Sequence, residues 1–234
     1  MSSAIMGQMV AFALMLALGL LCARIRIATR ASLPSAIALA TKVFLPAMIF
    51  SVMCQSLTRD LVVSHFPIIV LAVLFYALVI GIMRLLAALL HLNGGHSAAF
   101  RMVFIFGNTG FIGLPVLVTA FPETGAVNLM LFMLVDQVVF WTYGVMLAQT
   151  EGRSVGWRKM IKGFFNPNIV AMMIAFGLIF ADVPVNRELV SFMDVLGAAA
   201  TPLCMVCLGV LCYFSDIGRV LRCKEVYVGA FVKM

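Results

Sequence analysis

Seven long runs of hydrophobic residues, separated by short polar stretches, make up most of the chain. Most of these runs are about 20 residues long, which is the length that an α-helix needs to cross the hydrocarbon core of a bilayer. The pattern therefore predicts an all-α polytopic membrane protein. We expect its membrane-spanning helices over approximately residues 4–23, 34–56, 63–90, 99–121, 127–149, 167–181 and 189–214.

The last residues of the chain repeat the apolar pattern over a much shorter length. Residues 226–232 are apolar but provide only about a third of the length that a crossing helix needs. We therefore expect a chain that is truncated at the start of an eighth span, as a fragment or as a seven-span protein with a frayed tail.

The fourth run, 99–121, contains residues that interrupt a helix. Three glycines between positions 107 and 113 add backbone freedom, and Pro115 lacks the N–H group that would bond to the preceding turn. Asn108 and Thr109 place hydrogen-bonding side chains at the same point. Because unpaired backbone is tolerated in a bilayer only inside protein or beside a wet cavity, this break is a binding-site candidate. A kink packed against neighbouring helices is the alternative, and the run alone favours neither.

The break also predicts a preference for a negatively charged ligand. A second half-helix that starts near Phe111 presents free N–H groups and the positive end of a helix dipole. This end suits an anion such as a carboxylate. Asn108 and Thr109 are expected to add side-chain donors.

A carboxyl group lies near the middle of the fifth run. Asp136, which is followed by Gln137, is costly to place at the centre of a bilayer unless it is paired, hydrated or protonated. Its depth is similar to that of Asn108, so the two side chains are expected to face one polar cavity. A substrate or proton site is the favoured interpretation, because intramembrane acids usually mark function. A structural hydrogen bond, or a cap on backbone freed at the break, is the alternative.

The composition excludes a soluble globular domain. Of the 234 residues, 64% are hydrophobic and 11% are charged, and the mean hydropathy is +1.15, whereas soluble domains are roughly half apolar and a quarter charged. The net charge of +7 does not indicate a nucleic-acid partner, because the basic residues gather in alternate loops. The positive-inside rule places these loops in the cytoplasm and the N-terminus outside.

Other candidate chemistry is weak. The six cysteines, including Cys204 and Cys207, lie in or beside apolar runs and are expected to pack rather than to bind metal or form a disulfide. The sequence has no zinc-protease, serine-hydrolase or P-loop motif. We therefore expect neither an enzyme nor a protein with a cofactor.

Several stretches resemble the auxin efflux carrier family of membrane transport proteins, which includes the PIN auxin carriers and malonate permease-like proteins. The stretch GNTGFIGLPV in the fourth run is the most specific of them. The others are VFLPAMIF in the second run, Asp136-Gln137 with Trp141 and Gly144 in the fifth, FFNPNIVAMMIAFGLIF in the sixth and LGAAATPLCMVCLGVLCY in the seventh.

The resemblance implies an inverted-repeat transporter fold, in which two five-span repeats each contain a broken crossover helix. Residues 1–150 correspond to the first repeat, with its broken fourth span at 99–121. Residues 151–164 form a basic cytoplasmic loop, and residues 165–234 begin the second repeat. The proline in a similar setting in spans two and seven is weak independent support for an inverted repeat.

The resemblance also implies roles for residues of this chain. Asn108, Thr109, Gly110 and Pro115 match the crossover that binds substrate. Asp136 and Gln137 together match the region beside it, where we expect them to act as polar support or as a proton-sensitive switch.

The implied function is secondary active transport of small organic anions, such as carboxylates, by alternating access of a transport domain. Spans one, two, six and seven would form a scaffold, commonly a homodimer, in the plasma membrane. The chain departs from the family because the second crossover is missing, and its third span lacks the acid that plant members carry near the site. A non-transporting membrane scaffold or assembly subunit, or an inactive fragment, is the alternative. A sodium- or bile-acid-type carrier matches the motifs less well.

Overall fold

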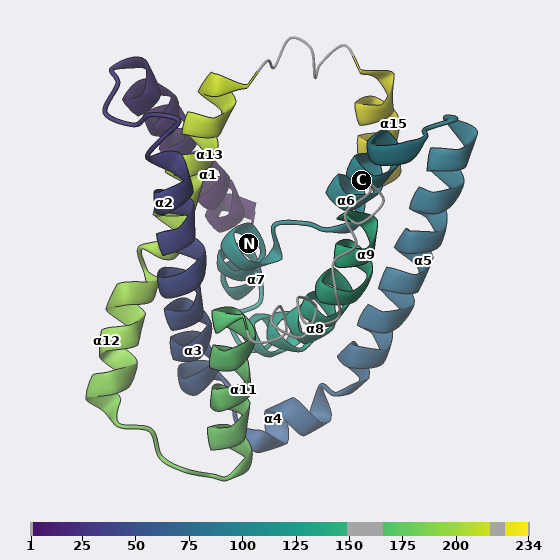
Figure 1. The fold of residues 1–234 in the computed structure, drawn as a ribbon. Coiled ribbons are helices and arrows are strands. Elements are labelled where there is room, and N and C mark those ends of the chain that lie inside the picture. The colour runs from purple at the N-terminus through teal and green to yellow at the C-terminus, as the bar shows by residue number, and fades with distance from the viewer. Residues whose placement is uncertain (1, 149–165, 216–222, 234) are drawn as a thin grey trace. The chain divides into compact units, whose positions relative to one another are not determined.

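The computed structural model describes residues 2–148, 166–215 and 223–233, and every regular element in these ranges is a helix (Figure 1). Among the described residues, six helical stretches are long and apolar enough to cross a membrane. A shorter apolar helix, α11 (Pro167–Phe180), matches the sixth expected span. The prediction of an all-α polytopic membrane protein is confirmed. The basic loop predicted at 151–164 lies outside the described residues.

The chain divides into two compact units. The first unit comprises Met1–His65, Asn108–Leu131 and Asn166–Asp216. Its elements are α1 (Ser2–Arg24), α2 (Leu33–Leu39), η1 (Ala40–Phe44), α3 (Leu45–Ser56), α4 (Arg59–Ser64), η2 (Thr109–Gly113), α7 (Leu114–Ala120), the first part of α8 (Gly125–Val139), α11, α12 (Arg187–Gly197) and α13 (Ala200–Phe214).

Helices α1 and α13 of the first unit pack with their backbones in close contact. A Cβ atom added to Gly19 would collide with the carbonyl oxygen of Val206, and one added to Gly209 would collide with that of Leu16. Small residues permit such an approach between apolar helices, where van der Waals packing replaces the hydrophobic effect as the main attraction. These two glycines therefore hold the first and seventh spans together.

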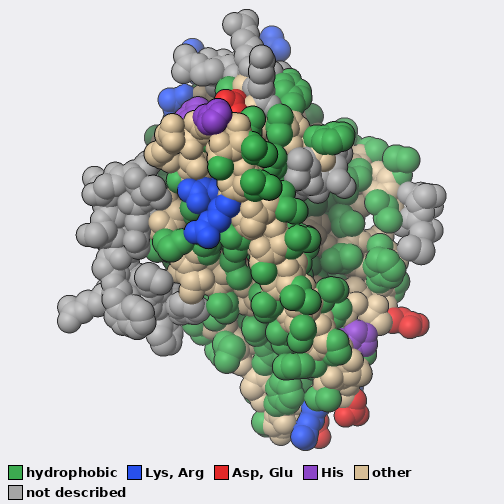
Figure 2. Space-filling view, turned by 90° about the vertical axis from the view of Figure 1, so that its right-hand side faces the viewer, with side chains coloured by type: hydrophobic (Ala, Val, Ile, Leu, Met, Phe, Trp, Pro, Cys, Tyr) green, Lys and Arg blue, Asp and Glu red, His purple; other side chains and the backbone are tan. Residues whose placement is uncertain are grey.

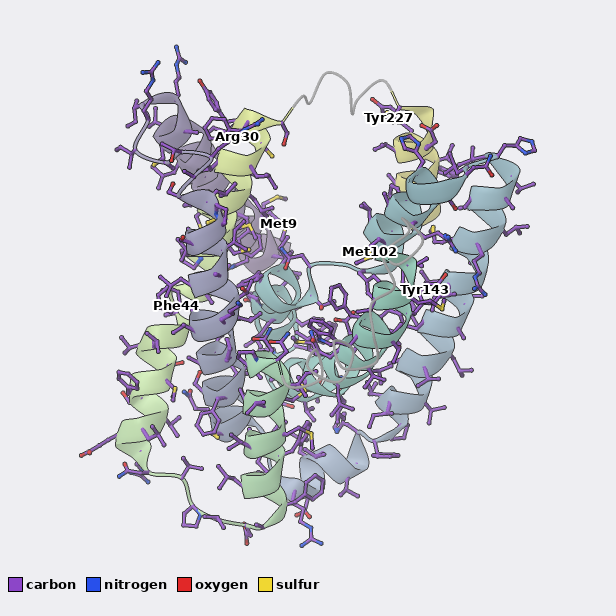
Figure 3. All side chains as sticks on the ribbon, viewed as in Figure 1. Met9, Arg30, Phe44, Met102, Tyr143 and Tyr227 are labelled. Carbon is purple, nitrogen blue, oxygen red and sulfur yellow. The ribbon has the colours of Figure 1, made fainter. Side chains whose placement is uncertain are left out.

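A second close contact fixes the middle of the seventh span. This span is interrupted between α12 and α13, and a Cβ atom added to Gly197 would lie 2.5 Å from the Cα atom of Met48 in α3. The C-terminal end of this span contacts Arg30, which is labelled in Figure 3. The Arg30 guanidinium donates to the carbonyl oxygen of Phe214 at 2.6 Å and lies over the Phe214 ring. An arginine at a helix C-terminus satisfies an exposed carbonyl and complements the helix dipole.

The second unit comprises Phe66–Gly107, Phe132–Phe165 and Ile217–Met234. Its described elements are α5 (Pro67–Leu89), α6 (Gly94–Ile105), the second part of α8, η3 (Phe140–Gly144), α9 (Val145–Ala148) and α15 (Lys224–Lys233). Its core forms around the face of α5 that carries Ala72, Tyr76, Met83 and Ala87. These residues recur at the spacing that places side chains on one side of a helix.

The opposite side of α5 is apolar and exposed. Figure 2 shows hydrophobic side chains covering much of this face. The exposed apolar residues of α5 are Val70, Leu71, Val73, Leu74, Phe75, Leu78, Leu85 and Leu89. A continuous exposed apolar surface on a long helix is typical of contact with lipid.

The third span begins later than the sequence predicts. Residues 59–64 form the separate helix α4, and the long helix starts at Pro67 instead of near residue 63. Proline is favoured in the first turn of a helix because its missing N–H group has no acceptor there. The polar residues Ser64 and His65 and the proline mark this boundary in the sequence, but the length of the apolar run alone does not register them.

Candidate functional site

The fourth span is broken where the sequence predicts. Helix α6 ends at Ile105, and helical structure resumes at Thr109 with the π-helical turn η2, which leads into α7. Asn108 caps this second half-helix, because its Oδ1 atom accepts a hydrogen bond from the Phe111 N–H group at 3.3 Å. The half-helix therefore starts two residues before the predicted position near Phe111. Single π-helical turns inside membrane helices often mark functional sites.

The break leaves some polar groups open. The Asn108 side chain is exposed, Thr109 is half-buried and Gly110 is buried. The amide groups of Ile112 and Gly113 bond to the carbonyl of Asn108, whereas those of Thr109 and Gly110 have no acceptor among the described residues. Two free amides at the positive end of a helix are suited to an anion.

The carbonyl that Pro115 leaves without a donor is bound by another span. In a regular α-helix the residue at position 115 would donate to Phe111, and proline cannot. Instead the Thr201 hydroxyl of α13 donates to the Phe111 carbonyl oxygen at 3.2 Å, in a buried position. Both polar groups of Phe111 are thus held by side chains, one from Asn108 and one from Thr201. One turn along α13, the Cys204 thiol lies close to the Asn108 side chain.

The carboxyl group of the fifth span is buried against a tyrosine. The Tyr76 hydroxyl of α5 donates to Oδ1 of Asp136 in α8, and the two residues are 2% and 6% exposed. The Tyr76 ring also packs against the rings of Phe75, Phe106 and Phe132. A buried carboxyl is tolerated in such apolar surroundings only when its oxygen atoms have partners.

Family comparison decides the class of the protein. The family model described as membrane transport protein matches residues 4–234, which is nearly the whole chain. The chain belongs to this family. It is therefore a multi-pass membrane transporter, and the resemblance to the auxin efflux carrier family is confirmed. No curated protein matches the chain.

Two residues of this membrane transport protein were missed by the sequence interpretation. Tyr76 lies near the middle of an apolar span, away from the span ends where tyrosine is usual, and this position is a usable signal. Thr201 belongs to a stretch that supports the family resemblance, but nothing local connects it with Phe111, 90 positions earlier.

The predicted site residues of this membrane transport protein fall into two groups. Asn108, Thr109, Gly110 and Pro115 belong to the first unit, where the first three lie at the break and Pro115 lies further along, in the first turn of α7. Asp136 and Gln137 belong to the second unit. Gln137 is half-buried and has no hydrogen-bond partner among the described residues. A shared cavity for the two groups stays a prediction.

The described part of this membrane transport protein contains no cluster of three or more His, Cys, Asp or Glu side chains that could hold a metal ion. Its donors at the break are amides, a hydroxyl and a thiol. These groups suit hydrogen bonding to an organic ligand better than coordination of a hard cation.

Proposed function

We propose that this membrane transport protein carries small organic anions such as carboxylates, by alternating access, and that the anion binds at the break in the fourth span. The observation that carries this proposal is the half-helix that begins at Thr109. It combines two amides without acceptors among the described residues with an exposed Asn108, whose Oδ1 atom accepts from the Phe111 N–H group. A carboxylate accepts hydrogen bonds from such donors without a fixed positive charge.

The wider arrangement follows from the family and the loop charges. We propose that residues 1–150 form a first five-span repeat and that residues 165–234 begin an inverted second one. The basic loops would face the cytoplasm, with the N-terminus outside the plasma membrane. Spans one, two, six and seven would form a scaffold that associates as a homodimer. The close packing of α1 against α13 is consistent with a rigid scaffold.

Asp136 and Gln137 would support the site from the fifth span. The buried hydrogen bond between Tyr76 and Asp136 gives this carboxyl a fixed position. A fixed intramembrane carboxyl is the kind of group that couples transport to protons. We therefore propose that the rate of transport depends on pH through Asp136.

The test is transport by the purified full chain in proteoliposomes, with labelled mono- and dicarboxylates, malonate among them, as probes. The decisive variant is Asn108→Asp. Aspartate caps a helix as well as asparagine does, so folding should be retained. Its negative charge would repel a carboxylate at the same point, and we expect transport to be lost.

The matched control is Asn93→Asp, because Asn93 is exposed at the start of α6 and makes no side-chain capping bond. This control should transport as the unmodified protein does. Transport at the normal rate by folded Asn108→Asp protein would contradict the site. Failure of every carboxylate probe to be transported by the unmodified chain would contradict the proposed substrate class and favour a non-transporting scaffold.

A further inference from the structure

Two arginines of the second unit converge on one tyrosine. The Arg84 Cζ atom of α5 lies 5.5 Å from the centroid of the Tyr143 ring, and Nη1 of Arg101 in α6 lies 3.5 Å from the Tyr143 hydroxyl. Tyr143, which is labelled in Figure 3, belongs to η3. Three spans therefore contribute to one cluster, which we call the arginine–tyrosine cluster.

The cluster carries positive charge without a matching negative charge. Neither guanidinium has a carboxylate partner among the described residues. Besides its contact with Tyr143, Arg101 donates one hydrogen bond, from Nε to the Ser97 carbonyl oxygen at 3.2 Å. Each guanidinium has five N–H donors. Most of the donors of this pair are therefore available to an added anion.

The cluster lies near the ends of its spans and is bordered by apolar side chains. Arg84 is five residues before the end of α5 and Arg101 is seven residues after the start of α6, which corresponds to about 8 Å and about 10 Å along the helix axes. Leu85, Leu89 and Val103 are exposed, at 61%, 65% and 65%. Charged groups at this depth beside exposed apolar residues face the boundary between lipid tails and headgroups.

We propose that Arg84, Arg101 and the Tyr143 hydroxyl bind the phosphate group of an anionic phospholipid. Two guanidinium groups without carboxylate partners favour an anion, and the planar fork of N–H donors in arginine matches the oxygen atoms of a phosphate group. The exposed leucines and valine favour a lipid over a soluble anion, because they offer a surface to the acyl chains. Basic sites between spans are a known form of lipid-headgroup recognition. This site shares no residue with the break in the fourth span and does not depend on which substrate is carried.

Arg30 provides a contrast within the same chain. Its guanidinium also lies over an aromatic ring, 5.6 Å from the centroid of Phe214, but it donates to the Phe214 carbonyl at 2.6 Å. This arginine is already engaged with a helix end. We therefore expect Arg30 to contribute little to lipid binding.

The experiment measures retention of phosphatidylglycerol by the purified full chain, titrated in detergent and followed by native mass spectrometry. Arg84→Gln and Arg101→Gln should each weaken binding about fivefold, and the double variant about thirtyfold, because a basic residue near a membrane surface contributes about a factor of five. Arg30→Gln should change binding less than twofold. Equal weakening by Arg30→Gln, or unchanged binding in the double variant, would overturn the proposal.

Melting temperature in nanodiscs identifies the source of the anion. In an equal mixture of phosphatidylcholine and phosphatidylglycerol, the unmodified chain should melt higher than in phosphatidylcholine alone, and the double variant should lose this increase. If inorganic phosphate in phosphatidylcholine raises the melting temperature as much, the cluster serves soluble anions and the lipid assignment is wrong. If a glutamine variant does not fold, Arg84→Lys with Arg101→Lys keeps the charge and removes the planar fork. That pair should still weaken binding, and unchanged binding would overturn the assignment.

Discussion

The break at Asn108 and the buried pair of Tyr76 and Asp136 both place polar groups in apolar surroundings. The two sites differ in how these polar groups are hydrogen-bonded. At the break the polar groups are backbone atoms and neutral side chains, and the bonds are shared among Asn108, Phe111 and Thr201. In the pair, an ionisable group accepts a hydrogen bond from a tyrosine inside an aromatic cluster.

This difference in bonding predicts different effects of substitutions on stability and on transport. When several neutral groups share the bonding, removing one of them costs a moderate amount of stability but alters the geometry of the others. When a buried carboxyl loses its donor, the cost falls on that group alone and is larger. We therefore expect the pair to matter more for stability and the break to matter more for transport.

The largest effect is expected from Tyr76→Phe. Loss of the hydroxyl should lower the free energy of unfolding by about 2–3 kcal/mol, because the buried Asp136 carboxyl loses a donor. The measurement is unfolding by SDS titration in mixed micelles. Tyr213→Phe is the matched control, since Tyr213 is 48% exposed, and it should change the value by less than about 0.5 kcal/mol.

Replacing both partners of the pair should reverse part of this loss. Tyr76→Phe combined with Asp136→Leu removes both partners of this buried hydrogen bond, so the double variant should be more stable than Tyr76→Phe alone. A double variant that is less stable than Tyr76→Phe alone would show that this hydrogen bond is not the main interaction of either side chain.

A smaller effect is expected from Thr201→Val at the break. The variant keeps the shape of the side chain but leaves the Phe111 carbonyl without its cross-span donor, which should cost about 1–2 kcal/mol. Thr201→Ser keeps the hydroxyl and should restore most of the stability. Thr142→Val is the control, because the exposed Thr142 donates to Val138 of its own helix at 2.7 Å. Equal losses in Thr201→Val and Thr142→Val would remove the distinction between the two threonines.

Pro115→Ala tests whether the proline and Thr201 act on one carbonyl. Alanine restores an N–H group that can reach Phe111, so adding Pro115→Ala to Thr201→Val should recover about 1 kcal/mol. Strictly additive effects on the free energy of unfolding would argue that the two residues act independently.

The smallest effect on stability is expected from Asp136→Asn. The amide oxygen still accepts the Tyr76 hydroxyl bond, so the free energy of unfolding should change by less than about 0.5 kcal/mol. The rate of transport should instead become independent of pH, because the titrating group is gone. A pH profile that keeps its shape in this variant would remove Asp136 from the proposed proton-sensitive role.

The elements of this fold that depend on local chemistry could be predicted from the sequence. Run length predicted the spans, and Pro115 with its neighbouring glycines predicted the break, because these effects act within a few residues. The start of the third span was placed too early, because run length alone passes over the polar residues Ser64 and His65 that precede Pro67.

The partners that complete each site could not be predicted in this way. Tyr76 and Asp136 are 60 positions apart, and Phe111 and Thr201 are 90 positions apart. Periodicity shows which side of a helix is apolar, but it does not show which helix lies beside it. The exposed Asn108 and its cap were within reach of local reasoning, whereas the donor to the freed carbonyl required the tertiary structure.

The paired glycines of α1 and α13 also have a consequence for biosynthesis. Gly19 and Gly209 are about 190 positions apart in the sequence, so at ordinary translation speeds roughly 10–40 s pass between the synthesis of the two. During that interval the groove around Gly19 has no helix to fill it, and lipid or the insertion machinery must cover it. The first span is therefore synthesised well before the seventh span that packs against it. Slower translation, or a bulkier residue at position 19, would increase the chance that the first span pairs with a wrong helix.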